Sequence, residues 1–329
     1  MQLDTALRTR LADRIVEDAT ASFALPATPP FHLEATVRLL QRRPTNRVDL
    51  WESGHYLRVL PTHDGLRLVT VSNLGTVDAP ELKGEVFGGP VATAEMEQLA
   101  ATVRLILGTD VDATPFYRVA ARDPQLRAVA TALRGLKPPR FPTLFETIAN
   151  VIPFQQVSLA AGAALVARLV ERCGERLSLG GRMYDAFPRA ERIVQLDTSE
   201  LQSLGLSRAK AVALHELAAR VLSGELTAER LEALPTAAAM EVLTALPGIG
   251  PWSAGLILLR GLRRMEVFPD GDVGAAKNLA RLLNLEGPLS VRDLRPLYDG
   301  FGSVKGYLYF YVLGWRLLDE GLITPARSR

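Results

Sequence analysis

Residues 243–262 read LTALPGIGPWSAGLILLRGL. The pattern predicts a helix that ends at LPGIG and a second helix that begins immediately afterwards, with Gly248 and Gly250 flanking Ile249. Glycine adopts the positive φ angles of such a turn and lets another backbone come close. The second helix presents N–H groups around Gly248, Gly250 and Ser253 at its positive dipole end, which suits a phosphate oxygen. This contact binds DNA without reading its sequence, although PGIG alone is also compatible with a plain helix–helix turn.

A loop that contains two aspartates follows the second helix. Residues 266–283 read EVFPDGDVGAAKNLARLL, and Asp272 directly precedes the helical part of this segment. Aspartate is a favoured helix N-cap and contributes about 1 kcal/mol there. A capping carboxylate is fixed in orientation and kept ionised by nearby N–H groups, so a capping role and a functional role are compatible. We expect Asp270, in the same loop, to be a solvated residue.

The N-terminal part of the chain has a mixed α and β pattern. HYLRVLP and LRLVTVS are β-rich runs joined by THDG, whose Asp64-Gly65 pair suits a tight hairpin of an antiparallel sheet. The segment ATAEMEQLAATVRLILG then has helical spacing and ends at Gly108. We therefore predict a small α+β domain over residues 1–108.

The remaining residues, 109–329, read as one helix after another, broken by proline and glycine. The segment 137–143 is a Pro-rich connector, and residues 144–174 form two helices or one helix interrupted at Pro153. The predicted fold class is therefore mostly α, with two helical lobes that carry the hairpin and an antiparallel sheet in the N-terminal domain.

The order of hairpin, second helix, Pro/Gly loop and aspartate resembles the helix-hairpin-helix/Gly-Pro-Asp (HhH-GPD) superfamily of DNA glycosylases, and particularly its bacterial 3-methyladenine DNA glycosylase II members. The spacing from Trp252 to Asp272 is similar to theirs. The segments ANVIPFQQVSLAAG and LQSLGLSRAKAVALHELAARV resemble the helices that precede the hairpin in that family. An α+β domain ahead of two helical lobes is the family's layout. The resemblance covers most of the chain and is weaker over the first hundred residues.

The resemblance implies a catalytic role for Asp272. Its carboxylate would stabilise the positive charge on the deoxyribose as the N-glycosidic bond of a flipped base breaks. The implied substrate is duplex DNA with alkylated purines such as 3-methyladenine, and the product is an abasic site. Relatives that also cut the strand carry a lysine where this chain has Trp252, so we expect no AP lyase activity. Oxidised or deaminated bases as substrates, or a non-catalytic DNA-binding protein, remain alternatives.

The resemblance also implies residues that read the damaged base. Gln156 is expected to fill the gap left by the flipped base, and Gln155 to contact the unpaired base or its neighbours; both are otherwise residues that cap or solvate a helix end. Alkylated purines are cationic, so an aromatic pocket would favour them. The pocket candidates are Trp252, Tyr307, Tyr311 and Leu313. Aromatic residues at helical spacing are more often part of a core.

Basic residues surround the hairpin and the aspartate. Those expected to face DNA are Lys277, Arg260, Arg263, Arg264 and Arg281, and the alternative for each is a solvated helix face. The resemblance further implies a Na⁺ or K⁺ ion bound by the backbone carbonyls of Thr244, Leu246 and Ile249, and no organic cofactor.

Composition is compatible with this interpretation. The 329 residues carry a formal charge of only +2, so any DNA-binding surface must be local. Cys173 is the only cysteine, which excludes an intramolecular disulfide and a Cys-rich zinc or iron–sulfur site. The sequence shows neither a signal peptide nor an apolar run of about 18 residues. We expect a cytoplasmic, nucleoid-associated monomer whose partner is double-stranded DNA.

Overall fold

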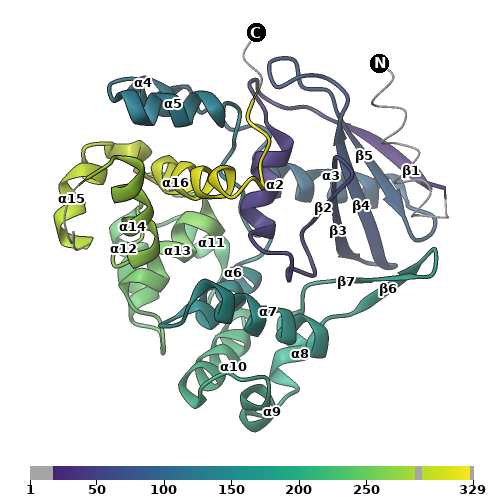
Figure 1. Cartoon of the computed structure of the whole chain (residues 1–329). Helices are drawn as coiled ribbons and strands as arrows, with labels where there is room; N and C mark the ends of the chain where they lie inside the picture. The colour runs from purple at the N-terminus through teal and green to yellow at the C-terminus, as the bar shows by residue number, and fades with distance from the viewer. Residues whose placement is uncertain (1–17, 286–290, 327–329) are drawn as a thin grey trace.

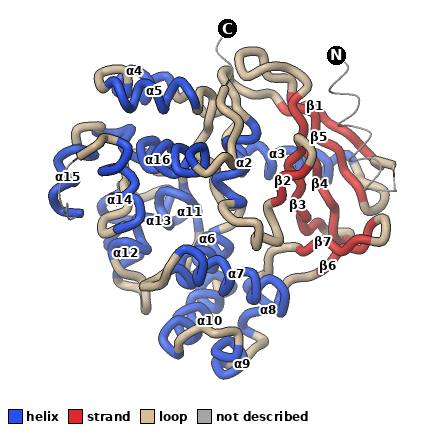
Figure 2. The backbone as a smooth tube through the Cα atoms, in the orientation of Figure 1, coloured by secondary structure: helices blue, strands red, loops and turns tan. Residues whose placement is uncertain are grey.

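The computed structural model describes residues 18–285 and 291–326. Its N-terminal part contains an antiparallel five-stranded sheet with the order β1-β5-β4-β3-β2, at the right of Figures 1 and 2. The strands are β1 (Ala21–Leu25), β2 (Leu50–Glu52), β3 (His55–Thr62), β4 (Gly65–Asn73) and β5 (Leu82–Phe87). In the β3–β4 hairpin Thr62 pairs with Gly65, so the predicted hairpin is confirmed and its two turn residues are His63 and Asp64.

Two helices accompany this sheet, α2 (Leu33–Gln41) and α3 (Thr93–Leu107). Helix α3 ends at Gly108, which has a left-handed φ of 62°, as its position after the last apolar residue predicts. Helix α2 has two apolar faces. Leu33 and Val37 pack in the core under the sheet, whereas Ala35 and Leu39 belong to the larger core of the helical part. Helix α2 therefore joins the two parts of the molecule.

The helical part has the two lobes that the sequence predicts, each held by contacts among its own helices. One lobe contains α6 (Leu144–Val151), α7 (Leu159–Cys173), α8 (Ala190–Val194), α9 (Thr198–Ser203), α10 (Arg208–Leu222), α11 (Ala228–Glu232), α12 (Thr236–Thr244) and α13 (Pro251–Leu262). The other contains α4 (Thr114–Ala120), α5 (Pro124–Ala132), α14 (Val273–Leu282), α15 (Val291–Asp299) and α16 (Lys305–Asp319). The interruption at Pro153 is confirmed as a short 3₁₀ turn, Ile152–Phe154, between α6 and α7. A second 3₁₀ turn, Gly302–Val304, precedes α16.

A two-stranded hairpin, which the sequence analysis did not predict, interrupts the helical part. Strands β6 (Arg176–Leu179) and β7 (Arg182–Asp185) pair antiparallel around Gly180 and Gly181, both with positive φ. The hairpin lies against the N-terminal sheet, where Leu179 and Tyr184 bury a small apolar cluster with Leu57 and Leu68 (Figure 1). A Gly-Gly pair between short runs is a hairpin signal, so the sequence does carry the information.

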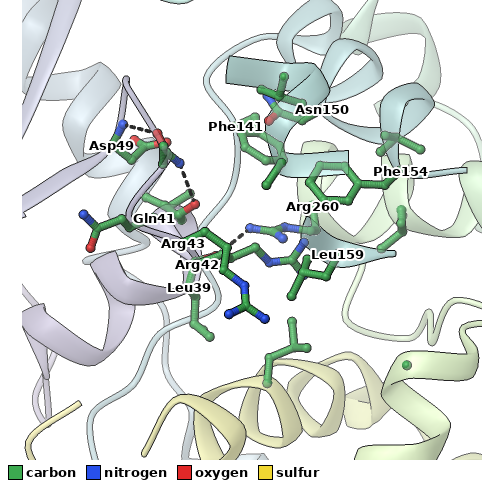
Figure 3. Close-up of a pocket in the computed structure, with 18 of the residues that line it drawn as sticks. Leu39, Gln41, Arg42, Arg43, Asp49, Phe141, Asn150, Phe154, Leu159 and Arg260 are labelled. Carbon is green, nitrogen blue, oxygen red and sulfur yellow. Dashed lines mark hydrogen bonds between the residues drawn. The ribbon is translucent and has the colours of Figure 1, made fainter. Parts of the chain in front are cut away.

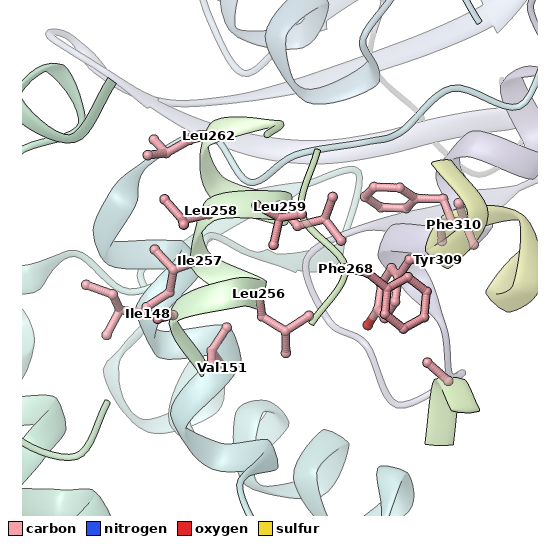
Figure 4. Packing of buried hydrophobic residues seen from close by; sticks show 14 of the residues in the cluster. Ile148, Val151, Leu256, Ile257, Leu258, Leu259, Leu262, Phe268, Tyr309 and Phe310 are labelled. Atoms are coloured by element: carbon pink, nitrogen blue, oxygen red, sulfur yellow. The ribbon is translucent and has the colours of Figure 1, made fainter. Parts of the chain in front are cut away.

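Helix α13 is the centre of the larger core. Its residues Gly255–Leu259 are all buried, and Figure 4 shows the leucines of α13 between Ile148 and Val151 of α6 on one side and Phe268 and Tyr309 on the other. Helices α6 and α13 cross closely where Gly261 of α13 faces Thr147 of α6. A Cβ at Gly261 would lie only 2.8 Å from the Thr147 hydroxyl oxygen. The helix that follows the GIG turn is thus held rigidly on both sides. No helix in the described ranges is long and apolar enough to span a bilayer.

A buried ionic cluster connects the sheet to α6. Arg58 of β3 donates to the Asp49 carboxylate at 2.7 Å and to both Glu146 oxygens at 2.6 Å, and Tyr56 donates to Asp49 at 2.8 Å. The side chains of Arg58, Asp49 and Glu146 are all less than 7% exposed. Burial raises the pKa of Glu146 to about 7, against the opposing effect of Arg58. Removal of the arginine would leave two carboxyl groups buried without their shared cation.

We predict that Arg58→Met lowers the free energy of unfolding by about 3–5 kcal/mol, because it leaves the buried Asp49 and Glu146 carboxyl groups without a partner. Arg182→Met is the matched control, since Arg182 holds Glu52 in a two-bond pair at 2.7 Å on the surface and should cost less than about 1 kcal/mol. Urea unfolding of both variants at pH 7 measures the difference. Equal destabilisation by the two substitutions would contradict the assignment.

Candidate active site

The turn between α12 and α13 contains two glycines that differ in backbone conformation and in surroundings. Gly248 has a φ of 73°, and a Cβ there would lie 2.6 Å from the Cβ of Ala213 on α10. Gly250 is the N-cap of α13 with φ −91° and ψ 179°, an ordinary extended conformation, and a Cβ there would meet nothing within 4 Å. Gly248 therefore supplies the turn and the packing, whereas Gly250 is exposed. The expectation of positive φ holds for Gly248 alone.

Free N–H groups lie at the start of α13. The Ala254 N–H donates to the Gly250 carbonyl at 2.9 Å and is the first to bond along the helix. The N–H groups of Trp252 and Ser253 come before it and have no acceptor carbonyl one turn back within the helix. Pro251, the first residue of the helix, has no N–H. The positive end of the helix dipole adds to these donors. The arrangement suits an anionic oxygen, as the sequence predicts.

Gln155 and Gln156 lie beside the hairpin, in the segment between α6 and α7. The Gln155 side-chain amide donates to the Gly248 carbonyl at 2.7 Å and to the Ser253 hydroxyl at 2.9 Å. Gln155 thus braces the turn, a contact that the sequence did not indicate. Gln156 is exposed and has a left-handed φ of 53°. Its exposure leaves it available for the predicted insertion into DNA.

Asp272 is the N-cap of α14, as predicted. Its Oδ1 accepts the Ala275 N–H at 2.8 Å, and Gly274 leaves room for the carboxylate, because a Cβ there would lie 3.3 Å from Oδ1. The preceding loop rests on α13, where a Cβ at Gly255 would lie 3.1 Å from the Cα of Pro269. The half-buried Asp272 lines a cavity.

That cavity has a volume of about 310 Å³ and lies where the two lobes meet the N-terminal domain. The predicted pocket residues Trp252 and Leu313 line it together with Asp272. Tyr309, which the sequence analysis did not select, also lines it and lies one helical turn before Leu313. The N-terminal domain contributes Arg42, Arg43 and Asp49, which Figure 3 shows with Phe141, Phe154 and Arg260 around the same space.

Tyr307 and Tyr311 do not line this cavity, and their prediction as pocket residues was wrong. Both are almost completely buried on another face of α16, where their rings lie 5.6 Å and 4.4 Å from that of Phe116 in α4. The Tyr307 hydroxyl donates to the Asp112 carbonyl, and that of Tyr311 to the Tyr117 hydroxyl at 2.9 Å. Side chains two residues apart on a helix point in directions about 200° apart. Because Tyr309 lies on the face of α16 that lines the cavity, Tyr307 and Tyr311 lie on the opposite face.

Three of the arginines expected on the DNA surface are bound to backbone carbonyls of the protein. Arg260 is buried, donates to the Leu39 carbonyl at 3.0 Å and lies 4.9 Å from the centre of the Phe141 ring. Arg263 donates to two carbonyls of the N-terminal half, and Arg264 to three in the α11–α12 segment. Burial lowers the pKa of Arg260 to about 9 and that of Arg263 to about 10. All three side chains thus donate to backbone carbonyls of the protein, which the sequence did not indicate.

The remaining predicted residues lie near the hairpin and α14. Lys277 and Arg281 are exposed on α14, as a DNA-facing role requires. Asp270 is not merely solvated, because it accepts the Tyr298 hydroxyl at 2.7 Å and lies 3.5 Å from Arg295. The carbonyls of Thr244, Leu246 and Ile249 all belong to the α12–α13 turn, and that of Leu246 accepts the Ile249 N–H at 3.2 Å. Residues 18–285 and 291–326 hold no cluster of three His, Cys, Asp or Glu side chains able to bind a metal.

Comparison with known proteins agrees with this geometry. Residues 149–293 match the family model for the HhH-GPD superfamily base excision DNA repair protein, and residues 22–142 match that for the AlkA N-terminal domain. The chain is 30% identical to DNA-3-methyladenine glycosylase 2 of Escherichia coli over 298 residues, which are 89% of this chain and 98% of that protein. This chain belongs to the HhH-GPD superfamily.

Two further relatives fit this HhH-GPD assignment. A DNA-3-methyladenine glycosylase of Bacillus subtilis is 31% identical over 229 residues, 70% of this chain and 75% of that protein. A solved structure of the 3-methyladenine DNA-glycosylase from Archaeoglobus fulgidus superposes with a TM-score of 0.75 at 26% identity, over 91% of this chain and 98% of that one. The similarity therefore extends through both the N-terminal sheet and the helical lobes.

The two glycines of the HhH-GPD hairpin provide a matched pair of substitutions. Gly248→Ala should lower the free energy of unfolding by about 2 kcal/mol, because it combines a positive φ with a Cβ 2.6 Å from Ala213. Gly250→Ala should cost less than about 1 kcal/mol, since its φ is ordinary and its surroundings are open. Thermal and urea unfolding compare them, and a larger loss for Gly250→Ala would show that the turn is held differently.

Proposed function

We propose that this protein is a monofunctional DNA glycosylase that flips alkylated purines, 3-methyladenine among them, out of duplex DNA and hydrolyses their N-glycosidic bond. The observation that carries the proposal is the position of Asp272, which lines a cavity of about 310 Å³ while its carboxylate caps α14. The names of the relatives support the same substrate class, since both bacterial proteins are 3-methyladenine glycosylases.

The proposed mechanism assigns one task to each part of the site. The N–H groups of Trp252 and Ser253 bind a phosphate of the damaged strand, and Lys277 adds charge beside it. Gln156 fills the space left by the flipped nucleotide, while the base enters the cavity. As the glycosidic bond breaks, positive charge grows on the sugar, and the fixed Asp272 carboxylate stabilises it. Water then adds to C1′ and leaves an abasic site. A module that only binds DNA backbone would not need a carboxylate held in this cavity.

We propose that the chemistry ends at the abasic site. Trp252 lines the cavity at the position where strand-cutting relatives carry an amine, and an indole cannot form a Schiff base. No organic cofactor is needed for hydrolysis by this set of residues. We further propose that the protein acts as a monomer on nucleoid DNA, since one chain holds the hairpin, the carboxylate and the cavity.

A monovalent cation is part of the proposal. The carbonyls of Thr244, Leu246 and Ile249 lie at the C-terminal end of α12, where the helix dipole places partial negative charge. The Leu246 oxygen uses one lone pair for the Ile249 N–H and retains another. Na⁺ or K⁺ would fit this all-carbonyl set, and its charge would strengthen the phosphate site.

Asp272→Asn should lower release of methylated purines from duplex DNA by at least about 100-fold, because it removes the anion that faces the sugar. DNA binding and folding should persist, since asparagine caps helices as well as aspartate does. Asp270→Asn is the matched control, because its carboxylate contacts Tyr298 and does not line the cavity. Chromatography of released bases measures both. Full activity of Asp272→Asn would refute the mechanism.

Borohydride should fail to trap a covalent complex between this protein and DNA that contains a substrate base, because the site offers no amine at position 252. A glycosylase/lyase treated in parallel shows that the reagent is active. A trapped band on a denaturing gel would overturn the assignment as a monofunctional enzyme. The proposal that the protein releases damaged bases would stand, since it does not depend on the residue at position 252.

A further inference from the structure

Gln156 occupies a strained position on the surface beside the hairpin. Its φ of 53° lies in the left-handed region that few non-glycine residues adopt, and its side chain is exposed. On one side of it the chain leaves the 3₁₀ turn Ile152–Phe154, and on the other Ser158 caps α7 by accepting the Ala161 N–H at 3.2 Å. A residue in this conformation costs free energy, so it persists only where the surrounding structure supports it.

Gln155, the preceding residue, supplies direct support. Its side-chain Nε2 donates to the Gly248 carbonyl at 2.7 Å and to the Ser253 hydroxyl at 2.9 Å. A glutamine amide nitrogen carries two hydrogens, and these two bonds use both of them. They join the segment before α7 to residues that follow 93 and 98 positions later in the chain. Ser253 is also one of the two residues whose N–H groups are proposed to bind phosphate.

Helix α10 supports the same two segments. Lys210 donates from Nζ to the Pro153 carbonyl at 3.1 Å, inside the 3₁₀ turn that leads to Gln155. Ala213 lies against the hairpin, where a Cβ at Gly248 would come within 2.6 Å of the Ala213 Cβ. Lys210 and Ala213 are three residues apart and share a face of α10. One face of a single helix therefore holds the segment with Gln155 and the hairpin turn at a fixed spacing.

A side chain that replaces a flipped nucleotide needs a rigid support. Taking a base out of the duplex costs stacking and pairing free energy. If the segment that carries Gln156 could move back, it would yield and the base would stay in the stack. The N–H groups at the start of α13 would hold the DNA backbone to the protein. A link between Gln156 and these N–H groups therefore makes phosphate binding press the inserted side chain against the base stack.

We propose that Gln155 is a positioning residue that couples phosphate binding at the hairpin to base flipping by Gln156. The inference rests on the proposed function and deepens it, since it names the residue that keeps the inserted side chain at a fixed distance from the phosphate site. This role differs from the contact with the unpaired base that the sequence analysis expects of Gln155. Loss of its two bonds should slow the extrusion of a paired base and leave binding to the DNA backbone unchanged.

The test separates base flipping from bond cleavage with two probes. One duplex carries a single 7-methylguanine opposite cytosine, and the other carries it opposite a tetrahydrofuran abasic analogue, where extrusion costs less. Gln155→Met keeps the length of the side chain and removes both donors. Single-turnover release from the paired probe should fall by about 10-fold, while release from the unpaired probe should stay within about 3-fold. Affinity for undamaged duplex should stay within about 2-fold, because backbone N–H groups make the proposed phosphate contacts.

A double variant tests the coupling itself. Gln156→Ala removes the inserted side chain and should also impair release mainly from the paired probe. If Gln155 acts through Gln156, the variant with both substitutions should lose no more activity than Gln156→Ala alone, whereas losses that multiply would overturn the proposal. Gln202→Met is the matched control, because the Gln202 amide donates to the Thr198 carbonyl at 3.0 Å in α9, away from the hairpin. All its values should stay within about 2-fold of those of the unmodified protein.

Each remaining result also decides the proposal. Equal loss on the paired and unpaired probes would place Gln155 in the chemistry or the fold, and about 10-fold weaker binding to undamaged duplex would make it a DNA contact; either overturns the proposal. Unchanged release by Gln155→Met overturns it and leaves the proposed function intact. No release by the unmodified protein from either probe refutes the proposed function and this inference with it. If Gln155→Met does not fold, Ser253→Ala decides, since it removes one acceptor and keeps the N–H, with an expected loss of about 3-fold on the paired probe alone.

Discussion

The hydrogen bond from the Ala275 N–H to the Asp272 carboxylate fixes the most important group of the site. While this bond caps α14, the orientation of the carboxylate is restricted. The loop before it is equally constrained, because Pro269 rests on the backbone of Gly255 in α13. That same helix begins at the hairpin. One rigid element of 12 residues, about 18 Å long, therefore sets the position of the N–H groups proposed to bind phosphate relative to the Asp272 carboxylate.

The N-terminal sheet is more than an addition to the helical lobes. Helix α2 contributes to both cores and ends at the arginines that form one wall of the cavity. The Arg58 cluster then ties β3 to α6, the helix that leads into Gln155 and the hairpin brace. A buried ionic cluster costs desolvation free energy, and well-packed apolar residues would hold the same elements. The hydrogen bonds of the Arg58 cluster are directional, so they fix the position of β3 relative to α6. An apolar contact would allow the two elements to slide past each other.

The parts of the site that sequence predicts are those built from neighbours along the chain. The GIG turn, the Asp272 cap and the break at Pro153 each depend on residues within one or two helical turns. The arginines show the limit of this reasoning. Arg260 and Arg263 follow the hairpin closely in sequence, yet they bind carbonyls 221 and 158 residues away, respectively, at Leu39 and Leu105. No local pattern reveals such partners. The prediction of Tyr307 and Tyr311 as pocket residues was wrong for a related reason. Periodicity shows which residues share a face of α16, but not which part of the molecule that face contacts.

The cavity contains charged groups of both signs, because Asp272 lines it from the N-terminus of α14 and Arg42 lines it from the end of α2. Breaking the bond of an uncharged nucleotide creates a separated pair of charges, positive on the sugar and negative on the base. A fixed anion beside the sugar would stabilise the first of these charges, which exists in the transition state and not in the ground state. A cationic nucleotide uses the anion alone, because its charge moves from base to sugar.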